Sequence, residues 1–78
     1  MIDFYATFKI SNDEQLQKLR VDLLQNNILI KNLHIEEDSE IYHYTFQGDW
    51  NGYNFLLGKP KEENDNYKIY SVEHFEDL

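Results

Sequence analysis

The stretch that decides the fold is residues 42–57, YHYTFQGDWNGYNFLL. Aromatic residues alternate with other residues before Asn51-Gly52, and aromatic and leucine residues follow it. Asn-Gly between two such runs is typical of a two-residue type I′ turn. We therefore predict a β-hairpin with its turn at this dipeptide, in which Trp50 lies opposite Tyr53.

In this register, one face of the hairpin carries most of its large apolar side chains. Tyrosine combines an apolar ring with a hydroxyl group that needs a hydrogen bond, so it suits both cores and interfaces. Two interpretations stay open: this face is the inside of the protein, or it is a surface for a partner. The residues of the face are Tyr42, Tyr44, Phe46, Trp50, Tyr53, Phe55 and Leu57.

The first part of the chain predicts a strand followed by a helix. Residues 2–10 alternate between apolar and polar positions, which is the pattern of a half-buried strand. Ser11 and Glu14 have the spacing of a capping box and predict a helix from there to about Gln25, with leucines along one narrow stripe. The Asn-Asn pair that follows is expected to end it, because asparagine tolerates the left-handed conformation.

Two further strands are expected over residues 28–35 and 67–74, the first with a bulge near Asn32. Residues 59–66 contain the only proline and are predicted to be a loop, and the last four residues a short tail. The predicted fold is an α+β single domain, 1–78, with the order β-α-β-β-β-β. Its mainly antiparallel, curved sheet has about five strands, with one helix packed on one face.

The acidic residues are concentrated in the second part of the chain. The net charge is −8, and residues 1–35 contribute none of it, because four acids there are balanced by four bases. Residues 36–78 carry eleven acids and three bases. Phosphate backbones are bound by clusters of lysine and arginine, so direct binding of nucleic acid is disfavoured. The charge instead favours a basic protein partner.

Residues with catalytic, metal-binding or cofactor chemistry are few and unspecifically spaced. There is no cysteine, the three glycines form no phosphate-binding loop, and the serines lack the surroundings of a nucleophile. His34 and Glu36 alone are too weak a pattern for a metal site. We expect no enzyme activity, no cofactor and no metal. The absence of cysteine and of a long apolar run predicts a cytoplasmic protein that does not bind membranes.

These observations predict a small acidic non-enzymatic binding protein that inhibits a basic protein, such as a nuclease or another nucleic-acid-binding protein. It would act as a nucleic-acid mimic or as an immunity protein, with carboxylates around aromatic anchors, and would be a monomer or weak homodimer. The alternative is a self-associating structural or adaptor domain that uses the uncovered aromatic face, and a small enzyme or ligand carrier is a third class. The predicted partner-binding residues are Glu36, Glu37, Asp38, Glu40, Tyr42, Tyr44, Asp49, Trp50 and Tyr53.

Overall fold

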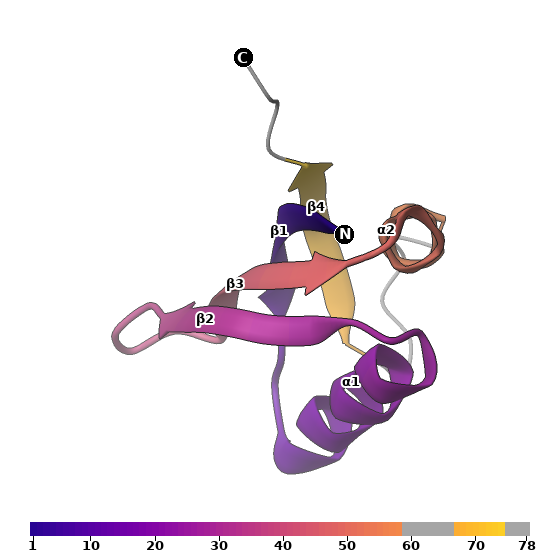
Figure 1. The fold of residues 1–78 in the computed structure, drawn as a ribbon. Helices are drawn as coiled ribbons and strands as arrows, with labels where there is room; N and C mark the ends of the chain where they lie inside the picture. The colour runs from indigo at the N-terminus through magenta and orange to yellow at the C-terminus, as the bar shows by residue number, and fades with distance from the viewer. Residues whose placement is uncertain (59–66, 75–78) are drawn as a thin grey trace.

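The computed structural model describes residues 1–58 and 67–74. They form an α+β fold with the element order β-α-β-β-α-β (Figure 1). The predicted loop over residues 59–66 and the predicted tail over 75–78 lie outside the described residues. The elements are β1 (Ile2–Lys9), α1 (Asp13–Gln25), β2 (Leu29–Ile35), β3 (Ile41–Gly48), α2 (Trp50–Leu57) and β4 (Lys68–His74).

The four strands form one antiparallel sheet in the order β2-β3-β1-β4. β1 pairs with β3 and β4, and β3 also pairs with β2, so β2 and β4 are the two edge strands. α1 connects β1 to β2, and α2 connects β3 to β4, so each helix joins two parallel strands that have a third strand between them. This is the split β-α-β, ferredoxin-like arrangement. The predicted α+β class and antiparallel sheet are confirmed.

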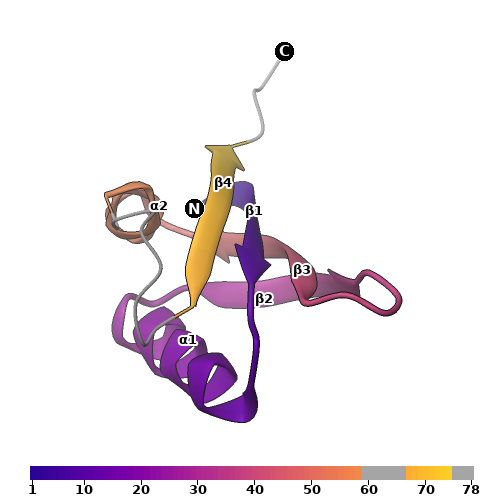
Figure 2. The ribbon, with the colours of Figure 1, turned by 180° about the vertical axis from the view of Figure 1, so that it is seen from behind.

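Both helices pack on the same face of the sheet, which we call the core face (Figures 1 and 2). The opposite face, which neither helix covers, is called the open face. Alternate residues of the two central strands point into the core, as the period of a strand requires. The ring centroids of Phe4 and Phe46, which pair across β1 and β3, are 5.5 Å apart. The buried core includes Phe4, Phe8, Tyr44 and Phe46 from the sheet and Leu19, Leu23 and Leu56 from the helices.

The predicted hairpin over residues 42–57 is wrong in its second half. The first half is β3 as expected, but the second half is the helix α2 rather than a strand. Asp49 caps this helix, because its side chain accepts a hydrogen bond from the backbone N–H of Gly52 at 2.9 Å. Aspartate is among the strongest N-cap residues, and its local hydrogen bond favours the helix over the turn. The sheet therefore has four strands instead of about five, and two helices cover it instead of one.

Gly52 is needed for close packing and not for a turn. A type I′ turn requires positive φ at both central residues, but neither Asn51 nor Gly52 has a positive φ. A β-carbon added to Gly52 would lie 2.8 Å from Cγ1 of Ile28 and 3.2 Å from the carbonyl oxygen of Asn26. The helix α2 thus lies so close to Asn26 and Ile28, which precede β2, that a larger residue at position 52 would force α2 or these residues to move.

The helix α1 forms where the sequence predicts it, with its cap one residue later. The N-cap is Asn12 rather than Ser11, and its side chain accepts a hydrogen bond from the N–H of Gln15 at 2.9 Å. The Gln15 side chain in turn accepts from the N–H of Ser11 at 2.8 Å, which gives a reciprocal pair like that of a capping box. Asn27 has a φ of 56°, so the predicted left-handed stop is confirmed.

Candidate functional site

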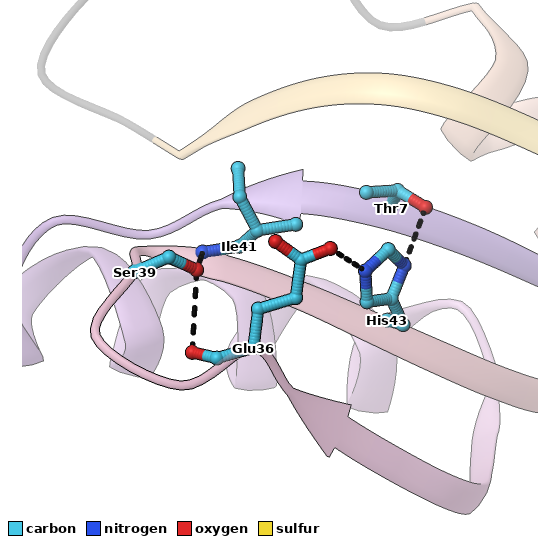
Figure 3. Close-up of polar contacts among 5 residues, drawn as sticks. All are labelled: Thr7, Glu36, Ser39, Ile41 and His43. Carbon is cyan, nitrogen blue, oxygen red and sulfur yellow. Dashed lines mark hydrogen bonds and ion pairs between the residues drawn. The ribbon is translucent and has the colours of Figure 1, made fainter.

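Four of the predicted site residues lie in the turn between β2 and β3, residues 36–40, which we call the acidic turn (Figure 1). The backbone N–H of Glu36 donates to the carbonyl of Ile41 at 3.0 Å and closes the turn. The Ser39 hydroxyl donates to the Glu36 carbonyl and accepts from the N–H of Ile41 (Figure 3). These bonds give the loop a defined shape. Its acids are Glu36, Glu37, Asp38 and Glu40.

Two of these carboxylates are engaged within the chain and two are not. Glu36 bonds to a histidine ring of β3, and Glu40 accepts a hydrogen bond from a serine hydroxyl of the β1–α1 connection at 2.8 Å. Within the part of the chain that the structure describes, the side chains of Glu37 and Asp38 form no hydrogen bond or ion pair. These two exposed carboxylates can therefore contact a partner without breaking an internal bond.

His43 links the acidic turn to the open face of the sheet. Its Nε2 lies 2.9 Å from Oε1 of Glu36, and its Nδ1 lies 3.1 Å from Oγ1 of Thr7 (Figure 3). The order of hydroxyl, imidazole and carboxylate resembles that of a hydrolase triad. However, the His43 and Glu36 side chains are 40% and 49% exposed and lie on a surface rather than in a pocket. We interpret these contacts as a clamp that holds the acidic turn against the sheet.

The aromatic side chains of β3 point into the core. Tyr44 is buried, and its ring stacks on that of Phe46 with the centroids 5.1 Å apart. Burial raises the pKa of the Tyr44 hydroxyl, because less water is present to stabilise the phenolate. Tyr42 is partly buried and stacks on Tyr44. Tyr44 and Phe46 therefore belong to the core of the protein and not to a surface for a partner.

The last three predicted site residues, Asp49, Trp50 and Tyr53, follow the end of β3 that is farther from the acidic turn. Asp49 follows the last residue of β3 and caps α2. Trp50 is 53% exposed, and its ring packs edge-on against the rings of Tyr53 and His74. Because β3 is eight residues long, this end is roughly 25 Å from the acidic turn. The structure thus places the predicted acids of residues 36–40 at one end of β3 and Asp49, Trp50 and Tyr53 at the other, with Tyr42 and Tyr44 on the core face between them.

Sequence reasoning missed the exposed edge of β2. No strand among the described residues pairs with the outer side of β2, and the apolar side chains of β2 are between 40% and 56% exposed. The predicted bulge is confirmed, because the register with β3 shifts between Ile30 and Asn32. A signal was present in the sequence, since consecutive apolar residues put apolar side chains on both faces of a strand. The exposed apolar residues are Leu29, Ile30, Leu33 and Ile35.

An apolar groove of about 310 Å³ lies beside the first residues of β2, between this strand and α1. Leu24 of α1 lines it although most of its surface is exposed to solvent. Arg20 is the one charged residue of the lining. The groove and the exposed edge of β2 are therefore continuous and mostly apolar. The lining residues are Arg20, Leu23, Leu24, Ile28, Leu29 and Ile30.

Among residues 1–58 and 67–74, no group of three or more histidine, cysteine, aspartate or glutamate side chains is arranged to hold a metal ion. None of the helices in these ranges has both the length and the apolar character needed to cross a membrane. Comparisons with protein families, with curated proteins and with solved structures give no match for this chain.

Proposed function

We propose that this chain is a non-enzymatic binding protein that blocks a basic surface of another protein. The observation that carries this proposal is the acidic turn, where the uncommitted carboxylates of Glu37 and Asp38 lie next to the exposed apolar edge of β2. Apolar side chains at the centre of an interface, with charges at its rim, provide affinity and select the partner. The charge at this rim is negative.

The class of partner follows from the charge. All of the net charge of −8 lies in residues 36–78. Proteins that handle nucleic acids carry clusters of lysine and arginine, so a nuclease or another nucleic-acid-binding protein is the partner that we propose. The same negative charge opposes direct binding of nucleic acid. A chain without cysteine suits a reducing compartment, and we propose that the inhibition takes place in the cytoplasm.

The placement of the acids favours a compact contact over mimicry of a nucleic acid. A row of carboxylates that imitates a phosphate backbone needs acids at alternate positions of a strand, about 6.8 Å apart. Among the described strands, β2 and β3 contain no acid, and β1 and β4 contain one each. The acids of the acidic turn form one cluster instead. We therefore propose an inhibitor of the immunity-protein type.

A self-associating domain is the second candidate function. An exposed apolar edge strand can also pair with the same strand of a second copy. Two copies each bring a net charge of −8, which opposes their association. Sedimentation at micromolar concentrations separates the two candidates, because the inhibitor is expected to be a monomer and the self-associating domain a dimer.

The test of the proposed function begins with capture of partners from a cell lysate on the immobilised chain at low salt. We expect a basic protein, and its association rate should fall by about tenfold or more between about 50 and about 500 mM salt, because ions screen the attraction. A captured partner without net positive charge, or an association rate that does not change with salt, would contradict the proposal.

A pair of charge variants then locates the surface. Glu37→Gln/Asp38→Asn removes two charges from the acidic turn, and asparagine suits the φ of 57° at position 38. The control, Asp13→Asn/Glu14→Gln, removes two charges from the first turn of α1. We expect the first variant to lose more affinity for the captured partner than the control. Equal losses would mean that only the total charge of the chain matters.

A further inference from the structure

We propose that the basic partner docks as an extended strand on the outer edge of β2, so that the sheet grows from four strands to five. This inference rests on the proposed function and names the part of the partner that the chain recognises. The occupant is a short extended segment that begins with lysine or arginine and continues with alternating apolar residues. Addition of a strand to a sheet edge is a common mode of peptide recognition.

The backbone of β2 is open to such a strand. Edge strands are usually protected by proline, by charged side chains such as lysine, by bulges or by a covering element. All seven residues of β2 are exposed, and none is proline. The strand does contain one lysine, Lys31, which forms an ion pair with Asp3 at 3.1 Å, and a bulge between Ile30 and Asn32 near its beginning. Within the described part of the chain, the outer side of β2 after the bulge, residues 32–35, is therefore open to pair with an added strand.

The side chains of β2 provide a matching apolar surface. Ile30, Leu33 and Ile35 pair with core-facing residues of β3, so all three lie on the core face. Paired residues of neighbouring strands share a face. Alternate side chains of an added strand would therefore contact these three residues, and one of them would enter the groove beside α1 where Leu24 lies. Burial of this exposed apolar surface favours the docked state.

The preference for antiparallel pairing sets the direction of the docked segment, and the charges at the two ends of β2 indicate which residues stand at its two ends. The acidic turn follows Ile35 at the end of β2, and Arg20 lines the groove beside its beginning. Antiparallel pairing is slightly more stable than parallel pairing. In an antiparallel arrangement, the first residues of the segment lie beside the acidic turn and the last ones beside Arg20. We therefore assign basic residues to the start of the segment and a carboxylate to its end.

A synthetic peptide tests this inference directly. The probe consists of two lysines, then alternating valine and threonine, and a final glutamate; a peptide of the same composition in reversed order is the control. We expect hydrogen exchange of the amides of residues 29–35 to slow by about tenfold or more with the probe, and less with the reversed peptide. Exchange of residues 68–74 in β4, the other edge strand, should not change. Equal protection at both edges, or none at β2, would overturn the inference.

A variant of β2 provides the matched test with the captured partner. Leu33→Thr/Ile35→Thr removes apolar surface while threonine keeps a high preference for strands, and Tyr70→Thr makes a similar change on the exposed edge of β4. We expect the β2 variant to bind the partner at least about tenfold more weakly and the β4 variant to bind normally. Circular dichroism confirms that both variants fold.

The two sets of variants distinguish failure of this inference from failure of the proposed function. If Glu37→Gln/Asp38→Asn weakens binding and Leu33→Thr/Ile35→Thr does not, strand addition is wrong while the acidic inhibitor stands. If neither pair weakens binding, both proposals are wrong. If the amides of β2 become protected in the chain alone as its concentration rises, the occupant is a second copy, and the inference is overturned.

Discussion

The strands β2 and β3 are neighbours with apolar side chains on the same face, but only β3 buries them. Phe46 of β3 is fully buried, whereas Ile30, its partner in β2, is 48% exposed. β3 lies between two strands, β2 and β1. Among the described residues, β2 has only β3 as a neighbouring strand. An edge position alone does not expose apolar residues, because Ile69 of the other edge strand, β4, is buried. The difference is that the core-facing apolar residues of β2, unlike those of β3 and β4, are left largely uncovered and remain free for a partner.

The largest expected effect tests this comparison through stability. Phe46→Ala should lower the free energy of unfolding by about 3–5 kcal/mol, because it leaves a cavity in the core. Leu33→Thr in β2 should cost only about 1 kcal/mol, because its side chain is already half exposed. Urea denaturation of both variants gives the two values. Similar losses would mean that β2 belongs to the core as much as β3 does.

A smaller effect is expected at the end of β3, where the chain leaves the sheet. Asp49→Ala should cost about 1 kcal/mol of stability, because it removes the cap that starts α2. Asp49→Asn is the control, since asparagine caps helices about as well as aspartate does. Thermal unfolding measures both changes. Equal loss in both variants would show that the charge of Asp49, rather than its capping bond, stabilises the fold.

The buried Tyr67 should make the stability of the fold depend on pH. Burial and the hydrogen bond to Asp22 raise the pKa of Tyr67 above its ordinary value of 10.0. A raised pKa in the folded state gives stability that is complete below about pH 10 and is lost as the pH rises above it, because the unfolded chain ionises first. We expect Tyr67→Phe to reduce the fall in unfolding free energy between about pH 9 and 11. An unchanged fall in the Tyr67→Phe variant would contradict this expectation.

Local patterns in the sequence predict most of the elements but not their arrangement. The alternation of residues 2–10 and the caps around α1 depend on nearby residues, so β1 and α1 were predictable. The Asn-Gly pair and Asp49 favour different local structures, and only the packing of Gly52 against Ile28 shows which one forms. The strand order joins segments that are far apart in the sequence. It therefore could not be derived from local patterns.

The sequence likewise predicts some features of the candidate site but not how they are arranged. A run of like charges is most stable in solvent, and the acids of residues 36–40 are all exposed. The predicted hairpin also placed Trp50 far from these acids, at its turn, but it put the aromatic residues of both halves on one surface. The structure instead buries Tyr44 and Phe46 and places Trp50 on a helix. The exposed edge of β2 depends on the strand order, which makes it a property of the whole sheet.

The central claim is that the partner contacts β2 and the acidic turn, and not the opposite end of β3, where Trp50 begins α2. The most direct test is the affinity of the captured partner for Leu33→Thr/Ile35→Thr and for Trp50→Ala, measured side by side. We predict a loss of about tenfold or more for the β2 variant and a change of less than about threefold for Trp50→Ala. A large loss for Trp50→Ala with normal binding of the β2 variant would contradict the claim and place the contact at the opposite end of β3.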